Sequence, residues 1–341
     1  MKKIVLFGEL MLRLKPEGKE RFFQNPRLEA VFGGSEANVA VSLSIFGKNT
    51  EYITALPDNA IGEGARNVLR QYGVNVNAVQ KDGRLGIYFL EDGACQRPSK
   101  VIYDRSGSCF AVTGPEEYNW ADKFNGAEWF HVSGVSPAVS EEACESVIAA
   151  VDEAKKAGCT VSVDLNYRRK LWKYGKSAES VMTLLASKAD VLIANEEDVQ
   201  YCLGIPLKNF NTPLESYRHL CEDVKKAFPN VSVVAVTLRQ SYSADRNGWS
   251  AVLSGKTGFY VSAHYDIENI VERVGAGDSF ASGLIYGLTT FSGDEEGERK
   301  TLDFATAAGC LKHSVAGDLN LSTKEEVENL ARGNSNGRIQ R

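Results

Sequence analysis

A segment in which the acid Asp278 follows two glycines, residues 271–283, carries more chemistry than any other stretch of the chain. Gly275 and Gly277 can adopt backbone conformations that are closed to other residues, and the residues after them predict a helix that begins here. A phosphate at this place would meet free N–H groups and the positive end of the helix. Asp278 would repel a phosphate, but it could accept a proton from a hydroxyl that attacks the phosphate. Capping of the helix is the simpler alternative, because Asp is a favoured cap.

A second glycine pair opens another predicted helix near the N-terminus. Gly33 and Gly34 would let a ligand approach the backbone closely, and Asn38 could hydrogen-bond a hydroxyl of that ligand. A tight turn followed by the start of a helix is the alternative interpretation of the same residues.

Two polar segments follow predicted buried strands, at the place where ligands bind in parallel α/β sheets. Residues 164–168 bring an acid, an amide and a guanidinium together, which is costly to bury without a partner or a ligand. Residues 195–198 are Asn-Glu-Glu-Asp, whose carboxylates could hold a hydrated Mg²⁺ through water. An acidic helix N-terminus that complements the helix dipole is the alternative for residues 195–198.

Composition bounds the class of protein. The chain has 341 residues, of which 43% are hydrophobic, so it can form one large α/β domain or two domains. Its net charge of −5, without a basic block, argues against nucleic acid or an anionic membrane surface as the main partner. Any anionic substrate must therefore be attracted by local charges.

Cysteine usage and the N-terminus bear on the compartment. The seven cysteines are scattered, with no CxxC pair and no zinc-ligand spacing, which predicts reduced thiols, no disulfide and no structural zinc. The apolar run within residues 1–8 is too short for a signal peptide, and no later segment reaches the length of a membrane span. We therefore expect a cytoplasmic protein.

Buried strand candidates alternate with helical stretches along most of the chain. Amphipathic helices are predicted at residues 141–157 and 178–189, where apolar residues recur at helical spacing. The alternation predicts a mostly parallel sheet that is covered by helices on both faces. The predicted strands of this sheet are residues 3–8, 49–55, 129–133, 160–164, 191–195 and 232–237.

Two strand-rich stretches, residues 10–32 and 84–112, interrupt this rhythm because no helix separates their strands. Their short strands predict a small antiparallel sheet that is inserted into the main domain as a lid. The exposed face of this sheet is a candidate surface for a homo-oligomer. The lid strands are predicted at residues 10–14, 86–90 and 101–105, the main domain at residues 1–9, 33–83 and 113–330, and a polar tail at residues 331–341.

Three separated motifs, in this order along the chain, resemble a known family. Residues 33–40 and 271–283 are similar to the two signature regions of the ribokinase-like (PfkB) carbohydrate kinases, and residues 56–74 resemble the helix between them. The resemblance covers residues 3–330. It implies an α/β fold, namely a three-layer αβα sandwich with a mostly parallel central sheet and a small inserted β-sheet lid.

Within that family, four segments look most similar to the 2-keto-3-deoxygluconate kinases, which transfer the γ-phosphoryl group of ATP to the 6-hydroxyl of a six-carbon keto acid. The implied products are 2-keto-3-deoxy-6-phosphogluconate and ADP. A fructokinase or ribokinase that acts on a neutral sugar is the alternative, and a non-catalytic sugar-binding regulator on the same fold is a further one. The four segments are residues 8–14, 103–105, 164–172 and 313–320.

The resemblance implies a role for each motif when it is carried over position by position. Asp278 would be the base, with the backbone of Gly275, Ala276 and Gly277 as an anion hole beside it. The residues implied to bind the substrate are Gly33, Gly34, Asn38, Tyr88, Tyr103, Arg105, Arg168 and Asp278. ATP would contact Asn195, Thr237, Arg239, Gly248, Ala308 and residues 275–277, with Mg²⁺ near Glu197 through water.

The sequence departs from the family pattern in two places. The family usually has Asp-Thr before its Gly-Ala-Gly-Asp segment, but this chain has Glu272-Arg273, so a monovalent-cation site near that loop does not follow from the resemblance. The nucleotide strand commonly ends in Thr-x-Gly, whereas here Arg239 follows Thr237 and could contact ATP phosphates or form a salt bridge. A dinucleotide oxidoreductase is disfavoured, because no GxGxxG fingerprint follows the first strand.

Overall fold

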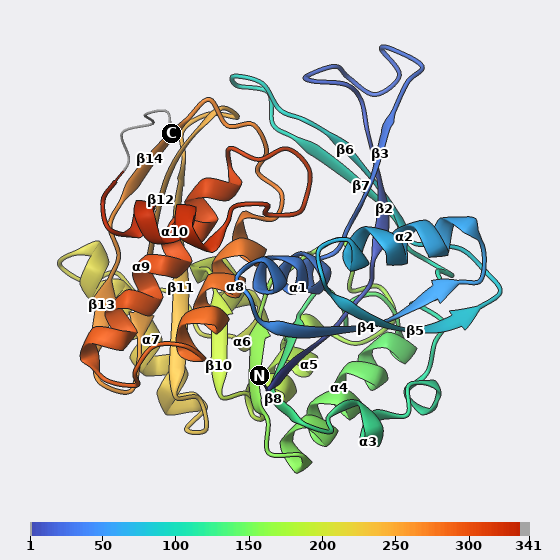
Figure 1. The fold of residues 1–341 in the computed structure, drawn as a ribbon. Coiled ribbons are helices and arrows are strands. Elements are labelled where there is room, and N and C mark those ends of the chain that lie inside the picture. The colour runs from blue at the N-terminus through green and yellow to red at the C-terminus, as the bar shows by residue number, and fades with distance from the viewer. Residues whose placement is uncertain (1, 335–341) are drawn as a thin grey trace.

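Strand β1 (Lys3–Phe7) shows how the sequence builds three layers. Its successive side chains point to opposite faces, so Ile4 and Leu6 enter one buried apolar cluster, whereas Val5 and Phe7 enter another. A strand that is buried on both faces needs cover on both sides, and helices lie on both faces of the sheet (Figure 1). The structure is a computed structural model that describes residues 2–334.

The main sheet is built from one long parallel part and an antiparallel edge. Its other strands are β4 (Asn49–Pro57), β5 (Asn75–Lys81), β8 (Ala127–Ser133), β9 (Thr160–Asp164), β10 (Val191–Ala194), β11 (Val233–Ser241), β12 (Arg246–Ser254), β13 (Phe259–Val261) and β14 (Tyr265–Glu268). The order is β13-β12-β11-β10-β9-β8-β1-β4-β5, and β14 pairs with β12. All neighbours from β11 to β5 are parallel, while β12 runs antiparallel to β11, β13 and β14.

Each face of the sheet has its own set of helices. One apolar cluster includes residues of α1 (Ser35–Ile45), α2 (Ala60–Arg70), α8 (Ala276–Leu288), α9 (Glu295–Lys312) and α10 (Lys324–Ala331). The other includes residues of α3 (Trp120–Lys123), α4 (Glu141–Lys156), α5 (Ala178–Ala186), α6 (Glu196–Leu203) and α7 (Pro213–Ala227). This is the predicted three-layer αβα sandwich. Among residues 2–334, no helix is both long and apolar enough to cross a membrane.

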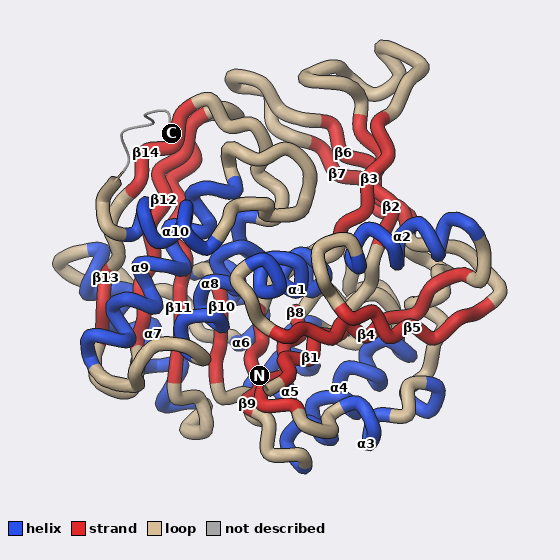
Figure 2. Tube along the Cα trace, viewed as in Figure 1, coloured by secondary structure: helices blue, strands red, loops and turns tan. Residues whose placement is uncertain are grey.

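A second, four-stranded sheet stands apart from the main one and projects away from it (Figures 1 and 2). It consists of β2 (Met11–Lys15), β3 (Glu29–Gly33), β6 (Ile87–Glu91) and β7 (Lys100–Asp104), in the order β3-β2-β6-β7. The predicted sheet is present, but the prediction that it is antiparallel was wrong, because β2 and β6 run parallel. The reason is that β2 follows β1 and β6 follows β5, two strands that run in the same direction in the main sheet.

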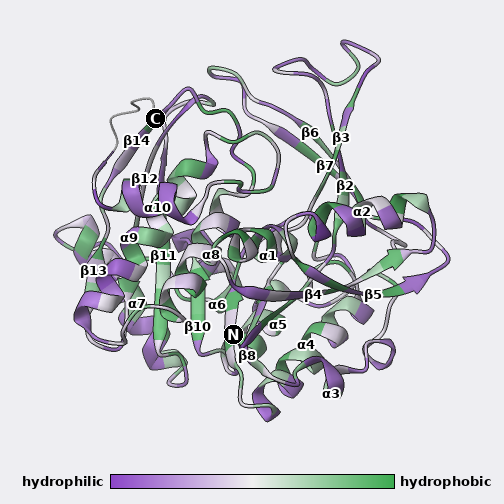
Figure 3. Ribbon diagram, viewed as in Figure 1, coloured by the Kyte–Doolittle hydropathy of each residue, from purple (hydrophilic) through white to green (hydrophobic). Residues whose placement is uncertain are grey.

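All six predicted strands of the main sheet are present, with ends that differ by a few residues. The two predicted helices start where expected and end at Lys156 and Ala186. The central strands are also the hydrophobic ones, whereas the loop that joins β2 and β3 is mostly hydrophilic (Figure 3). The predicted tail begins inside α10, which ends at Ala331, and its residues 335–341 lie outside the described residues.

Helix α1 is fixed to the end of β8 by a buried acid. Glu36, in the first turn of α1, accepts hydrogen bonds from the backbone N–H and the hydroxyl of Ser133 and from the hydroxyl of Ser136, each at 2.8 Å. A Cβ on Gly8 would overlap the carboxylate of Glu36, so β1 approaches this helix closely. The position of α1 therefore depends on a carboxylate that is removed from water.

We expect Glu36 to make stability depend on pH. Burial raises the pKa of Glu36 from 4.5 to about 7, so the folded protein holds this proton more tightly than the unfolded chain does. The corresponding stability is fully present below about pH 4.5 and is lost as pH rises to about 7, a change of up to about 3 kcal/mol. Glu36→Gln cannot ionise, so its free energy of unfolding should fall less between pH 5 and pH 8.

Urea unfolding at the two pH values measures this difference. Glu63→Gln serves as the control for loss of a carboxylate. Glu63 lies on α2, is exposed and pairs with Arg66 and Arg70. The same pH dependence in Glu36→Gln and in the original protein would contradict the assignment.

Candidate active site at the carboxyl ends of the strands

One cleft of about 760 Å³ opens at the carboxyl ends of β9, β10 and β11. Helices α1 and α8 begin at its floor, and the small sheet contributes one wall. This is the edge where a parallel α/β sheet places its ligands. The predicted site residues that line it are Gly34, Asn38, Tyr88, Tyr103, Arg105, Arg168, Asn195, Glu197, Thr237, Arg239, Gly275, Ala276, Gly277 and Asp278.

Three predicted residues do not line this cleft. Gly33 ends β3 and packs against the side chain of Asp318, with which a Cβ would overlap. Gly248 lies within β12 opposite Gln240. Ala308 is buried in α9, where it packs against Gly283 of α8.

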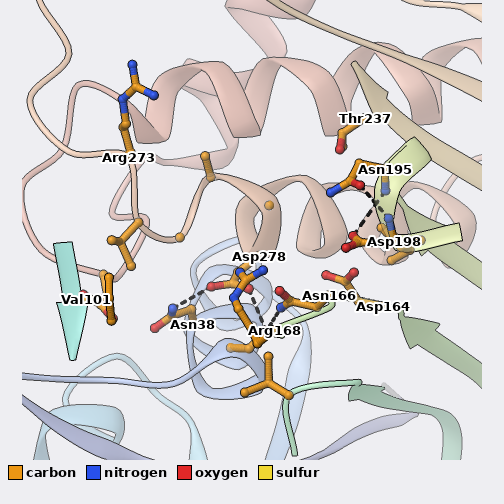
Figure 4. A pocket seen from close by; sticks show the side chains of 18 of the residues that line it. Asn38, Val101, Asp164, Asn166, Arg168, Asn195, Asp198, Thr237, Arg273 and Asp278 are labelled. Carbon is orange, nitrogen blue, oxygen red and sulfur yellow. Dashed lines mark hydrogen bonds between the residues drawn. The ribbon is translucent and has the colours of Figure 1, made fainter. Parts of the chain in front are cut away.

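Asp278 does not cap its helix. The N-cap of α8 is Gly275, and Asp278 lies three residues later. Its two carboxylate oxygens accept hydrogen bonds from the hydroxyl of Ser35 and the side-chain amide of Asn38, each at 2.7 Å. Figure 4 shows Asn38 beside Asp278. The capping alternative is therefore wrong, and both partners of the acid come from the start of α1.

The surroundings of Asp278 act on its charge in opposite directions. Burial raises the pKa of Asp278, because water cannot solvate the charged form. The hydrogen bonds from Asn38 and Ser35, and then the positive charges of Arg168 and Lys312, act to lower this pKa. The acid is thus withdrawn from water, but it is surrounded by groups that favour its ionised form.

The loop before α8 needs glycine at position 275 for two separate reasons. Gly275 has a φ of 83°, in the left-handed region that side chains disfavour, and a Cβ on it would overlap the carbonyl oxygen of Asp318. Gly277 has open space where its Cβ would lie. The N–H group of Ala276 donates to the carbonyl oxygen of Arg273 at 3.4 Å, whereas Gly277 lies in the first helical turn, where N–H groups lack helical partners.

Three carboxylates converge in the cleft. Asp164 ends β9, and burial together with the charges of Asp198 and Asp278 raises its pKa well above the ordinary value. Burial also raises the pKa of Asp198 to about 6. Figure 4 shows Asp164 near Asp198. A cation placed among these groups would relieve their repulsion.

Asn195 and Asp198 also have a local structural role. The side chain of Asn195 accepts from the N–H of Asp198 at 2.8 Å, and Asp198 accepts in return from the N–H of Asn195 at 3.4 Å. This capping box begins α6, so the predicted acidic helix N-terminus is present and faces the cleft. Within residues 2–334, no group of three or more His, Cys, Asp or Glu side chains could hold a metal ion.

Two arginines reach the cleft from opposite walls. Arg105 follows β7 and is 5% exposed; its Nε donates to Glu9 Oε2 at 2.5 Å. Its Nη1 atom is buried and has no partner among the described residues, although Arg105 lines the cleft. Arg168 lies in the loop after β9, is exposed, and acts electrostatically on Asp164, Asp198 and Asp278.

Sequence reasoning missed several residues that position these groups. Ser35 holds Asp278, and Asn166 donates to Ser35 at 3.1 Å from a backbone with a φ of 36°. Ser35 lies within residues 33–40 and Asn166 within residues 164–168. Both segments had been singled out from the sequence, and this was the available signal. Asp318 accepts from the hydroxyl of Tyr88 and pairs with Arg13 at 2.5 Å, a contact between residues 305 positions apart that no local pattern indicates.

Comparison with known proteins places these features in context. Residues 1–325 match the family model described as pfkB family carbohydrate kinase. A 2-dehydro-3-deoxygalactonokinase from Haloferax volcanii is 31% identical over 336 residues, which span 98% of each chain. The crystal structure of a 2-dehydro-3-deoxygluconokinase from Thermotoga maritima has a TM-score of 0.91 and 42% identity, over 98% of this chain and 100% of that chain. A probable fructokinase-4 from Arabidopsis thaliana is 27% identical over 342 residues, or 97% of each chain.

These comparisons confirm the resemblance that the sequence motifs indicated. The family match includes both glycine-containing signature segments and all four strands of the small sheet. The oxidoreductase alternative is therefore wrong. Because the family model matches nearly the whole chain, the chain belongs to the pfkB family of carbohydrate kinases and is a sugar kinase.

Proposed function

We propose that this kinase transfers the γ-phosphoryl group of ATP to the 6-hydroxyl of 2-keto-3-deoxygluconate. The observation that carries the proposal is the buried guanidinium of Arg105: its Nη1 atom has no partner among residues 2–334, and Arg105 is one of the residues that line the cleft. A buried donor that lacks a partner is costly, and the carboxylate of a sugar acid would satisfy it. The relatives from Haloferax volcanii and Thermotoga maritima are named as kinases of such keto acids.

Asp278 is the general base in this proposal. It accepts the proton of the 6-hydroxyl as the oxygen forms its bond to the γ-phosphorus and the bond from that phosphorus to ADP breaks. Ser35 and Asn38 each hold one of its oxygens, which fixes the carboxylate toward the hydroxyl. The N–H groups of Ala276 and Gly277 face the charge that builds up on the phosphoryl oxygens.

The keto acid lies between the small sheet and α1. Tyr88 and Tyr103 are neighbours on β6 and β7, with ring centroids 6.3 Å apart, and both belong to the cleft lining. Gly34 lines the sugar end of the cleft, whereas contact between the sugar and Gly33, which packs against Asp318, stays a prediction. The carboxylate end is directed to Arg105 and Arg168, and the 6-hydroxyl end to Asp278.

ATP occupies the other end of the cleft. Asn195, Thr237 and Arg239 line this end, and the guanidinium of Arg239 lies 5.4 Å from the ring centre of Trp249. Contacts from Gly248 and Ala308 to the nucleotide stay a prediction. Mg²⁺, held through water near Glu197, would neutralise phosphate charge, and the convergence of Asp164, Asp198 and Asp278 supports a cation there.

The chain is divided into a main domain and a lid, and the small sheet is the lid of this active site. It excludes water, since an exposed γ-phosphoryl group would be hydrolysed. The cysteine usage favours a cytoplasmic location. The Glu272-Arg273 pair, which replaces the usual Asp-Thr, gives no support for a monovalent-cation site near the loop.

A fructokinase is the second candidate, because a probable fructokinase-4 is 27% identical to this chain. A neutral sugar gives Arg105 and Arg168 no anionic partner. The two functions therefore differ in whether a carboxylate on the sugar is required.

Asp278→Asn tests the base. The variant keeps the size of the side chain but cannot take the proton, so we expect kcat to fall by on the order of 10²–10⁴ while ATP still binds. ADP release measures kcat, and calorimetry measures ATP binding. Asp303→Asn, which removes a half-buried carboxylate of α9 outside the cleft, should retain normal kcat. Near-normal turnover of Asp278→Asn would reject the assignment.

The two arginines decide the substrate. We expect kcat/KM for 2-keto-3-deoxygluconate to exceed that for fructose or ribose by far. Arg168→Lys should raise KM for the keto acid about tenfold, or by about 1.4 kcal/mol, because an ammonium cannot match both carboxylate oxygens. Arg84→Lys is the control, since Arg84 pairs with Asp104 beside the cleft. Equal kcat/KM for fructose and the keto acid would favour the fructokinase.

The outer face of the lid supports a proposal of self-association. By strand register, Leu12, Phe32, Phe89 and Ile102 share the face opposite Tyr88. Leu12 and Phe32 pack against the main apolar core, whereas Ile102 is 55% exposed. A second copy of the chain would cover the part of this face at Ile102. Sedimentation should show a dimer that Ile102→Glu converts to a monomer, whereas Ile61→Glu, at an exposed residue of α2, should leave the dimer intact. A monomer at micromolar concentration would contradict the proposal.

A further inference from the structure

Lys312 is the most deeply buried cation next to the proposed anion hole. It is the last residue of α9 and has no exposed surface. Its ammonium donates to the carbonyl oxygen of Val315 at 2.8 Å. A buried ammonium is costly unless it is paired, so its placement needs an explanation.

Lys312 belongs to a cluster of four buried charges, and the other three are Arg13, Asp318 and Glu272. Arg13 of β2 pairs with Asp318 at 2.5 Å and with Glu272 at 2.9 Å, and these three side chains are at most 3% exposed. Both carboxylates also act electrostatically on Lys312. Two acids and two bases give a cluster with no net charge, and removal of Lys312 would leave one negative charge in excess.

This cluster is in direct contact with the loop that leads to α8. Glu272 accepts from the N–H groups of Arg273 and Val274 at 3.0 and 3.2 Å, so it shapes the backbone just before Gly275. The carbonyl oxygen of Asp318 packs against Gly275 so closely that a Cβ would overlap it. A Cβ at Gly275 would also lie 3.2 Å from the Cε of Lys312. The ammonium therefore stands directly behind the N-terminus of α8.

We propose that Lys312 is a built-in cation that positions the loop at residues 275–277 and balances the buried carboxylates behind it, so that an anionic phosphoryl group can approach. Lys312 is a positioning residue, since it acts through the loop and not on the substrate. The inference rests on the proposed anion hole, in which the backbone N–H groups of this loop meet the phosphoryl oxygens. Without Lys312 the phosphoryl group would approach an uncompensated negative charge.

The charge state of Lys312 adds a second readout. Burial lowers the pKa of Lys312 from 10.5 to about 8, against the opposing effect of the nearby carboxylates. If the ammonium form is required, kcat falls as pH rises through about 8, and this alkaline limb is absent from a variant that cannot titrate. The charged or titratable groups that face Lys312 are Glu272, Asp318, Arg13, Asp278 and the adjacent His313.

Lys312→Met tests the inference, because it keeps the apolar stem and removes the charge. We expect kcat to fall about 10- to 100-fold, with KM for the sugar changed by less than about threefold. Lys225→Met is the matched control: Lys225 of α7 is half-buried and also donates to a carbonyl oxygen, that of Gly255 at 2.7 Å, but lies outside the cleft. In Lys312→Ala, methylammonium at tens of millimolar should restore part of kcat, and it should not affect the original enzyme.

The outcomes separate this inference from the proposed function. Normal kcat in Lys312→Met, together with a large loss in Asp278→Asn, would overturn the role of Lys312 and leave the base in place. Normal kcat in both would reject the site itself. If the single variants fail to fold, the double variant Glu272→Gln/Lys312→Met restores charge balance and keeps an acceptor for Arg273 and Val274. Because the buried charges of the double variant balance, its kcat should lie within about tenfold of that of the original enzyme, and a larger loss would overturn the inference.

Discussion

An acid that accepts a proton must lie next to its substrate, away from water, and still keep its negative charge. This conflict organises the cleft around Asp278. Burial raises the pKa of Asp278, whereas the hydrogen bonds from Ser35 and Asn38 act to lower this pKa. Both donors belong to the first turns of α1, and Glu36 in the same turn is tied to the end of β8. The geometry around Asp278, the proposed base, thus depends on how one helix is attached to the sheet.

In the proposed function, the same cleft has to admit a highly charged nucleotide beside several carboxylates. Burial and then the charges of Asp198 and Asp278 raise the pKa of Asp164, and these carboxylates would also repel phosphate. The overall charge of −5 gives no general attraction for anions. Positive charge must therefore be supplied locally, and Arg105, Arg168 and the positive end of α8 supply it from different sides.

The parts that sequence analysis could predict are those determined locally. Strands buried on both faces, such as β10, are short apolar runs, and Gly275 before Asp278 marks a backbone conformation that other residues disfavour. The antiparallel edge of β12, β13 and β14 escaped prediction because β13 and β14 are only three and four residues long and β12 contains polar residues and a glycine. Pairings across long separations left no local pattern: Asp278 meets Ser35 over 243 positions, and Arg105 meets Glu9 over 96.

The buried ion pairs of Arg13 also limit how the lid can move. Arg13 belongs to β2, at the base of the small sheet, and both of its partners lie in loops that pack around the start of α8. Separating a buried guanidinium from its carboxylates costs about 3–5 kcal/mol, which is comparable to the stability of many domains. Closure of the lid that we propose therefore has to leave Arg13 in place. The proposed motion is then confined to the parts of the small sheet beyond this residue, because Arg13 stays paired with the loops around the start of α8.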